Sequence, residues 1–224
     1  MVSDLPVVYQ SRRLDAYREA LTFLQTNRHT FRCACSRRVL QDAVYAGTCR
    51  DRSLSAAVGR SIRLRAADVT IEIQDALQGT YRQHIAAEVG DFVIRRADNI
   101  IAYHLAVVVD DAWQQITEIV RGVDLLDSTP RQVYLQGLLG LPSPAFVHLP
   151  VVVDQAGVKL SKQTGALSVD AWPPRRLLHE ILKALGQQPP GEIANVPVRE
   201  AMEWAARHWT LTRVPGGYGV PAPP

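Results

Sequence analysis

The chain has little cysteine and no long apolar run, and each scarcity excludes a class of protein. Three of its 224 residues are cysteine, and the first residues show no basic segment followed by an apolar stretch. This pattern excludes a secreted disulfide scaffold. The longest clean apolar run, residues 105–109, is too short to cross a bilayer. We therefore expect a cytoplasmic protein that does not enter a membrane.

The composition is that of an ordinary globular protein. Hydrophobic residues make up 47% of the chain and charged residues 21%, which excludes a disordered or collagen-like chain. A formal net charge of +3 is compatible with a nucleic-acid partner but does not require one. The length allows one large domain or two small ones.

Hydrophobic periodicity predicts strands that alternate with helices. Apolar residues recur at helical spacing in 11–27, where Ser11 is a suitable N-cap, and alternate with polar residues in 62–65 and 69–73. The apolar stretch 100–113 fits a helix or a buried strand, and its length favours a helix. Further strands are expected at 92–95, 116–120 and 146–154, and further helices at 128–139, 173–185 and 198–208. The alternation indicates an α/β fold.

The three cysteines form one cluster that is typical of a metal site. Cys33, Cys35 and Cys49 offer three thiolate ligands, one fewer than tetrahedral zinc requires. The fourth ligand could be His29, Tyr45 or water, and general ligand statistics favour the histidine. No Glu or His lies between the first and last cysteine to transfer protons, so the pattern indicates a structural metal. The alternative is three incidental buried thiols.

Two segments place charge where α/β sheets bind ligands. Residues 159–163 (Lys-Leu-Ser-Lys-Gln) follow a buried strand and a glycine turn, a position that suits phosphate binding, although surface lysines are usually only solvated. Arg121 ends an apolar strand, where its guanidinium needs an anion. That anion is a ligand carboxylate or an internal partner, Asp124 or Asp110. Tyr103 lies in an apolar stretch, where a packed core tyrosine is the usual case.

These segments, in their order along the chain, resemble the class I glutamyl-tRNA synthetase family. The resemblance covers most of residues 7–209. It rests on the motifs AYHLAVVVDD at 102–111, EIVRG at 118–122, STPRQ at 128–132, FVHLP at 146–150 and KLSKQ at 159–163. The Cys-x-Cys…Tyr-x-x-x-Cys pattern, and a chain that ends after about two helices, are similar to the short paralogues that glutamylate queuosine in tRNA(Asp).

The resemblance implies an activity, its partners and its site residues. The implied activity is ATP-dependent activation of L-glutamate without tRNA, with Mg²⁺ accompanying ATP. Transfer to queuosine at the wobble position of tRNA(Asp) follows, carried out by a monomer. Tyr103 and Arg121 match glutamate-binding positions, and Lys162 matches a catalytic lysine that contacts ATP. The ATP-binding loop would be Lys159, Leu160, Ser161, Lys162 and Gln163, and one structural Zn²⁺ would be held by Cys33, Cys35, Tyr45 and Cys49, so that Tyr45 replaces His29.

The implied fold is an incomplete Rossmann-like nucleotide-binding domain of the class I synthetase type. We expect this domain at 1–30 and 100–172, with a zinc-bearing, strand-rich insertion at 31–99. A helical segment at 173–214 and a disordered tail at 215–224 complete the predicted organisation.

The family begins with a strand and a His-x-Gly-His-like turn. None of the six histidines of this chain lies in a motif of that kind. Part of the ATP site is therefore expected to be missing, and adenylate formation at a useful rate is not expected from the chain as written. The alternatives are a non-catalytic, zinc-containing tRNA-binding relic, and a fragment of an ordinary glutamyl-tRNA synthetase.

Overall fold

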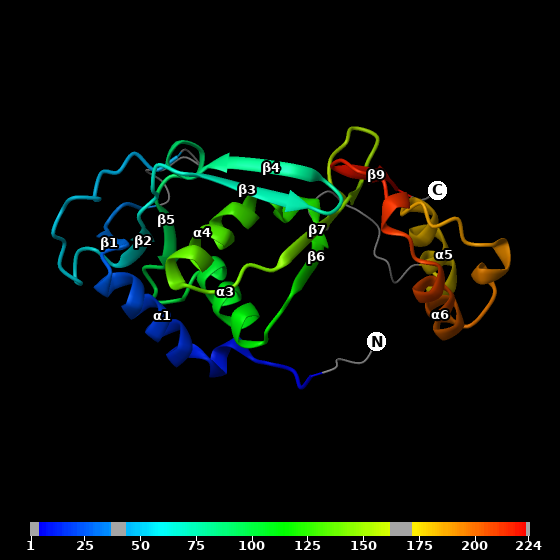
Figure 1. Ribbon diagram of the computed structural model, residues 1–224, viewed down its shortest axis with the longest axis horizontal. Coiled ribbons are helices and arrows are strands. Elements are labelled where there is room, and N and C mark those ends of the chain that lie inside the picture. Colours follow the sequence, from blue (N-terminus) through cyan, green and yellow to red (C-terminus); the bar gives the residue numbers. More distant parts are fainter. Residues whose placement is uncertain (1–4, 37–43, 162–171, 223–224) are drawn as a thin grey trace. The chain divides into compact units, whose positions relative to one another are not determined.

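The computed structural model in Figure 1 describes residues 5–36, 44–161 and 172–222. The chain forms two compact units. Unit 1 comprises Met1–Gln74, Thr80–Ile119 and Asp127–Ala145, and unit 2 comprises Asp75–Gly79, Val120–Leu126 and Phe146–Pro224. In the described ranges, no helix is long and apolar enough to span a membrane.

Unit 1 combines an antiparallel sheet with helices. The sheet has the strand order β1-β2-β5. Its register pairs Phe31 with Arg63 and Leu64 with Phe92. The elements of this unit are α1 (Leu14–Thr26), β1 (Thr30–Cys33), β2 (Ser61–Leu64), most of β3 (Thr70–Asp75), β4 (Gly79–His84), β5 (Phe92–Arg95), α3 (Tyr103–Trp113) and α4 (Thr129–Leu139).

The core of unit 1 forms where the apolar sides of these elements meet. Leu24, Leu64, Ile94, Leu105 and Leu135, from five different elements, are fully buried in one cluster. Such burial stabilises a fold by roughly 1.5–3 kcal/mol for each large aliphatic side chain. The core therefore supplies the rigid support for the polar groups described below.

The predicted helices of unit 1 are present, with two shifted starts. The stretch 100–113 is helical from Tyr103 onward, because Ala102 still has extended backbone angles. Helix α1 begins at Leu14 rather than after Ser11, because residues 10–12 form a short 3₁₀ turn. Helix α4 ends at Gly140, as predicted, with a φ of 67° that favours glycine.

A buried carboxylate fastens α3 to α1. Asp110 accepts hydrogen bonds from Arg13 Nε at 2.6 Å, Tyr17 Oη at 2.7 Å and Gln10 Nε2 at 3.1 Å. Burial and the bond to Asp110 raise the pKa of Tyr17 to about 12, so the phenol remains a donor. The Arg13 guanidinium also lies 4.0 Å from the centre of the Trp113 ring. Asp110, one of the two alternative partners of Arg121, therefore bonds to α1.

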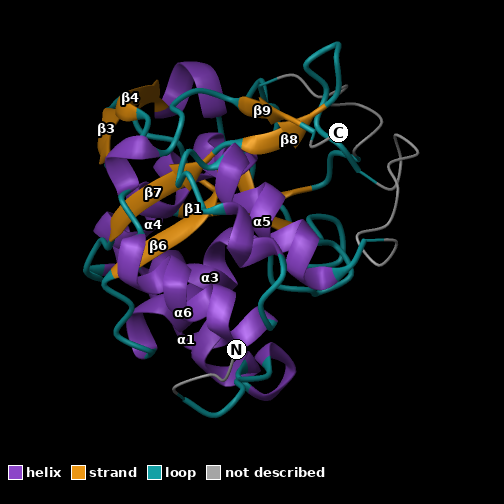
Figure 2. Ribbon diagram, turned by 90° about the vertical axis from the view of Figure 1, so that its right-hand side faces the viewer, coloured by secondary structure: helices purple, strands orange, loops and turns teal. Residues whose placement is uncertain are grey.

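Unit 2 contains strand ends, a helix pair and a two-stranded ribbon. Helices α5 and α6 pack against each other. Strands β8 and β9 run parallel and side by side (Figure 2). The elements that lie wholly or mostly in this unit are β6 (Glu118–Gly122), β7 (Ala145–Leu149), β8 (Val151–Val153), α5 (Pro174–Ala184), α6 (Val198–His208) and β9 (Gly219–Pro221). The last residue of β3, Asp75, pairs in parallel with Phe146 of β7.

Two predictions for unit 2 need correction. The single strand expected at 146–154 is divided into β7 and β8 at Pro150, which has no N–H to donate to a ladder. The tail expected to be disordered from residue 215 contains β9, which pairs with β8. Gly217 is held as well, because its N–H and C=O both bond to the side-chain amide of Gln78.

Replacing Asp110 with Ala should destabilise the protein strongly. The change leaves Arg13 and Tyr17 without their shared acceptor, and removing one partner of a buried ion pair costs about 3–5 kcal/mol. Chemical denaturation measures the loss. Asp15→Ala is the matched control, because Asp15 pairs with Arg18 on an exposed surface and should change the free energy of unfolding by less than about 1 kcal/mol. Equal losses for both variants would contradict the role of Asp110.

Candidate active site and metal centre

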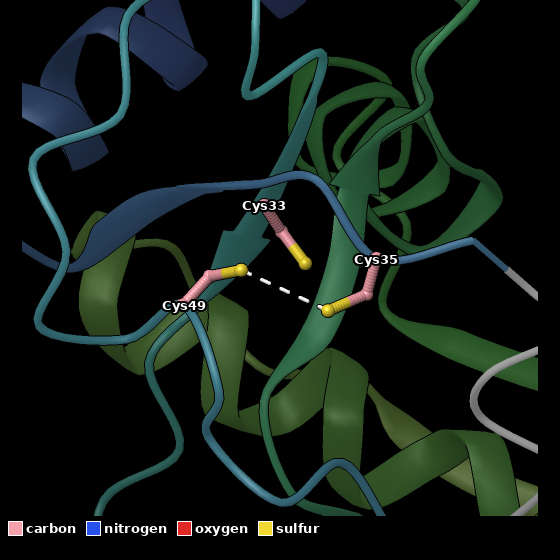
Figure 3. Close-up of side chains that lie close together, drawn as sticks. All are labelled: Cys33, Cys35 and Cys49. Atoms are coloured by element: carbon pink, nitrogen blue, oxygen red, sulfur yellow. Dashed lines mark hydrogen bonds between the residues drawn. The ribbon is translucent and has the colours of Figure 1, made fainter.

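Three thiols and a phenol converge in unit 1. The Sγ atoms of Cys33, Cys35 and Cys49 all lie within 4.8 Å of one another. Figure 3 shows the three sulfur atoms pointing toward a common centre, with Cys35 and Cys49 separated by 3.7 Å. The Tyr45 Oη lies 3.5 Å from the Sγ of Cys33 and 3.9 Å from that of Cys35. These four side chains are the knuckle.

The geometry of the knuckle fits a tetrahedral metal ion. Zinc–sulfur bonds of about 2.3 Å place two sulfur ligands about 3.8 Å apart, and a zinc–oxygen bond of about 2.0 Å places the oxygen about 3.5 Å from sulfur. The separations of Cys35 from Cys49 and of Cys33 from Tyr45 are close to these values. His29, the ligand favoured by general statistics, is not a member of the metal-ligand group found in the described residues.

The surroundings of the knuckle act differently on its ligand groups. Arg63 is buried, and its guanidinium lies 4.1 Å from the centre of the Tyr45 ring. Burial acts to raise the pKa of Cys33, but hydrogen bonding with Tyr45 and with Arg63 outweighs it and lowers the pKa to about 7. Burial raises the pKa of Tyr45 well above its usual range, while the Cys49 N–H donates a 2.7 Å bond to its oxygen. Burial also raises the pKa of Cys35. The case for a metal ion therefore rests on the convergence of the four ligand atoms, and Cys33 is the ligand that ionises most readily.

A second polar group lies in unit 2, where β3, β6 and β7 end. Arg121, near the end of β6, donates from Nε to the Nε2 of His148 on β7 at 3.0 Å. Its terminal nitrogen Nη2 donates to the carbonyl of Leu125 at 3.4 Å. The Nδ1 of His148 lies 2.6 Å from a carboxylate oxygen of Asp75 at the end of β3. Asp75, His148 and Arg121 together are the strand-end triad.

Residues 159–163, called here the lysine loop, follow the triad residue His148 along the chain. Lys159 forms an isolated β-bridge with Val153, and its ammonium lies 2.6 Å from a carboxylate oxygen of Asp124. Asp124, the other alternative partner of Arg121, therefore bonds to the loop. Leu160 donates its N–H to Val152. Ser161 is the last described residue of the loop, and the predicted residues Lys162 and Gln163 lie outside the described residues.

Tyr103 is located in unit 1, whereas Arg121 is located in unit 2. Tyr103 is the first residue of α3 and is 50% exposed, which corrects the interpretation of a packed core tyrosine. It lines a pocket of about 550 Å³ together with Cys35, Ser61, Arg63 and Arg96. The side chain of Tyr103 is therefore half-exposed at the wall of this pocket.

Two members of the strand-end triad were not predicted. Asp75 and His148 are separated by 73 residues in the sequence, and both side chains are fully buried. A signal was available in the sequence, because a histidine within the apolar strand Ala145–Leu149 must find a partner there.

Comparison with known proteins identifies the family. The family model for tRNA synthetases class I (E and Q), catalytic domain, matches residues 2–203. The chain belongs to this family. The chain is therefore of the class predicted from its motifs, an aminoacyl-tRNA synthetase-like ligase with an α/β catalytic fold.

Individual proteins are also similar to this chain in sequence or in structure. A protein of Thiobacillus denitrificans named glutamyl-Q tRNA(Asp) synthetase is 45% identical over 96% of this chain and 74% of its own length. One of the same name from Aromatoleum aromaticum is 47% identical over 96% of this chain and 71% of its own length. The crystal structure of a glutamate tRNA ligase from Elizabethkingia meningosepticum in complex with its amino acid has the same fold. Its TM-score is 0.71 at 21% identity, over 97% of this chain and 52% of that one.

Proposed function

We propose that this protein activates L-glutamate with ATP and transfers the glutamyl group to queuosine at the wobble position of tRNA(Asp). The observation that carries the proposal is the similarity of 45–47% over 96% of the chain to proteins named for that activity. The motif residues and the strand-end triad also support the proposal, because their charged side chains suit the binding of a carboxylate and of phosphates.

The proposed chemistry needs positioning and charge neutralisation more than covalent help. A carboxylate oxygen of glutamate attacks the α-phosphorus of ATP, and pyrophosphate leaves. Arg121 binds the side-chain carboxylate of glutamate, because a guanidinium matches a carboxylate bidentately. Tyr103 contacts glutamate through its hydroxyl. The charges of Lys162 and Lys159 would neutralise the charge that grows on the leaving phosphates, and Mg²⁺ would accompany the nucleotide.

Replacing Arg121 with Ala should weaken the use of glutamate. Loss of one partner of a desolvated charged pair costs about 2–5 kcal/mol, so kcat/KM for glutamate should fall by roughly 30-fold or more. Glutamate-dependent ATP–pyrophosphate exchange measures this effect, and the Kd for glutamate, measured by calorimetry, records the same loss of binding without requiring adenylate formation. Arg199→Ala is the control, because Arg199 is exposed on α6 and pairs only with Glu203 of the same helix in the described structure.

The same assay separates the alternative functions. Exchange without glutamate, or exchange that Arg121→Ala does not change, would contradict the proposed role of Arg121. Binding of tRNA without any exchange would favour a non-catalytic RNA-binding module. Esterification of tRNA(Glu), rather than modification of queuosine-containing tRNA(Asp), would favour an ordinary glutamyl-tRNA synthetase activity.

The knuckle is proposed to hold one structural zinc ion through Cys33, Cys35, Tyr45 and Cys49. The donor set and the distances fit zinc, which would crosslink the turn around Cys49 to the end of β1. Four anionic ligands leave a zinc site with a net charge of −2, and the buried guanidinium of Arg63 beside Tyr45 offsets part of that charge.

About one zinc ion per chain is expected by elemental analysis of protein purified without chelator. The double substitution of Cys33→Ser and Cys49→Ser should abolish binding. Tyr45→Phe should lower zinc affinity by at least roughly tenfold, since loss of even an outer partner costs about 10–100-fold. His29→Gln is the matched control and should retain normal affinity. A wild-type protein free of metal would overturn the site.

Arginines near the knuckle support tRNA as the partner. Residues 28–65 contain nine arginines and two aspartates, in a chain whose net charge is only +3. Arg32 donates to the carbonyl of Gly59, and Arg95 donates to the carbonyl of Arg60. Burial lowers the pKa of Arg95, and the nearby charge of Arg32 lowers it further. In the described part of the chain, no carboxylate lies within ion-pair distance of these three arginines. We propose that RNA phosphates contact them.

Replacing Arg32 and Arg60 together with Gln should weaken binding of tRNA and reduce its dependence on salt. Each lost phosphate contact lowers the slope of log affinity against log salt concentration by about one. Filter binding or fluorescence anisotropy at several salt concentrations measures the slope. Arg82→Gln with Arg199→Gln removes the same charge from two exposed, ion-paired positions and should leave the slope nearly unchanged. An equal effect of both pairs would indicate only non-specific attraction.

A further inference from the structure

The strand-end triad links the ends of three strands through one histidine, and all three residues lie in unit 2. Asp75 comes from β3, His148 from β7 and Arg121 from β6. The imidazole lies between the other two side chains, 2.6 Å from the Asp75 carboxylate and 3.0 Å from Arg121 Nε. The side chains of Asp75 and His148 are both fully buried.

The arrangement determines the tautomer of His148. An arginine Nε–H can only donate, so the Nε2 of His148 must accept and carries no proton. The neutral ring then has its proton on Nδ1, which donates to the Asp75 carboxylate. The position of Asp75 therefore fixes the imidazole of His148, and the imidazole in turn fixes the Nε of Arg121.

Asp75 is itself fixed by backbone groups. Its Oδ1 accepts hydrogen bonds from the N–H groups of Leu77 at 3.0 Å, Gln78 at 2.8 Å and His148 at 3.3 Å. Burial opposes its ionisation, yet these bonds and the imidazole keep the pKa of Asp75 below its usual range. An ionised, immobile carboxylate thus supports one end of the triad.

The other end of the triad is a half-buried arginine. A free arginine side chain has several rotatable bonds, and ordering it costs binding free energy when a ligand arrives. The contact with His148 uses Nε, so an incoming carboxylate would be received by the terminal nitrogens. One of them, Nη2, also donates to the carbonyl of Leu125, a residue that follows the end of β6.

We propose that Asp75 and His148 are positioning residues, which fix the guanidinium of Arg121 before a carboxylate binds to it. The identity of that carboxylate as the side chain of glutamate rests on the proposed function. Asp75 and His148 do not touch the substrate. Their contribution is to reduce the loss of side-chain freedom on binding.

The first test is spectroscopic and does not depend on activity. In the full chain labelled with ¹⁵N-histidine, His148 should show a protonated Nδ1 and an unprotonated Nε2. Asp75→Asn should reverse this pattern, because the Asn amide can donate to Nδ1 and leave the proton on Nε2. A protonated Nε2 in the wild type would overturn the proposal.

The second test uses a pair of substitutions at one position. Gln can replace both functions of the imidazole, because its amide nitrogen donates to Asp75 and its oxygen accepts from Arg121. His148→Phe fills the space without either bond. We expect His148→Phe to raise KM for glutamate roughly tenfold, with KM for ATP unchanged, and His148→Gln to restore most of the loss. His208→Phe, at an exposed position on α6, is the control for both constants.

The outcomes separate positioning from folding and from the proposed function. Equal increases of both KM values in His148→Phe, or no rescue by Gln, would overturn the positioning role. Should His148→Phe not fold, as judged by thermal unfolding, the tautomer and the Asp75→Asn reversal decide the question. A wild-type protein with the expected tautomer but no glutamate binding would contradict the proposed function and leave the positioning of Arg121 supported.

Discussion

A guanidinium is permanently charged and sits at the end of a flexible chain, so it contributes to a site only where the fold holds it in place. Both candidate sites of this protein depend on that constraint. Arg121 is held by a buried imidazole, and Arg63 is held between the carbonyl of Asp91 and the ring of Tyr45. Arg63 is buried, so the exclusion of water strengthens the interaction of its charge with its partners. Arg121 is only half-buried, and its fixed position comes from the buried imidazole of His148.

A related constraint explains why polar side chains gather at the strand ends of unit 2. The interior of a parallel sheet offers its backbone groups to neighbouring strands, so polar side chains are accommodated where the strands stop. Asp75, His148 and Arg121 each lie at or next to the last residue of a strand. Pro150 ends β7 directly after this point, and the chain continues as β8 toward the lysine loop. The triad therefore lies where the ladder of backbone hydrogen bonds ends, and the lysine loop comes further along the chain.

Much of the fold could be predicted because periodicity reports burial. The strand 92–95 and the helices near 129–139, 174–184 and 198–208 show clear apolar spacing, and they are present. Strand β4 was not predicted, because its sequence GTYRQH is mostly exposed and shows no regular alternation. Strand β9 was missed for a different reason. A segment rich in glycine and proline resembles a disordered tail until a partner edge, here β8, is known.

The candidate sites could be predicted by residue type but not by partner. The spacing of the three cysteines indicated a metal site, and an arginine after an apolar strand indicated an anion. Choosing between His29 and Tyr45 required knowing which side chain the turn before Cys49 brings to the thiols. The partner of the Arg121 Nε could not be predicted from the sequence either, since His148 lies 27 residues away along the chain. The two internal partners considered for Arg121, Asp124 and Asp110, bond to Lys159 and Arg13 respectively.

The uneven distribution of charge connects the knuckle to the proposed RNA partner. With nine arginines in residues 28–65 and a net charge of only +3, the rest of the chain is net negative. A uniformly basic protein attracts RNA in any orientation, whereas a protein with one basic segment attracts it mainly to that segment. Zinc bound to the knuckle would crosslink the turn around Cys49 to strand β1, which carries Arg32. The metal would then have a second role beyond local stability, because it would hold in place one of the arginines proposed to contact RNA phosphates.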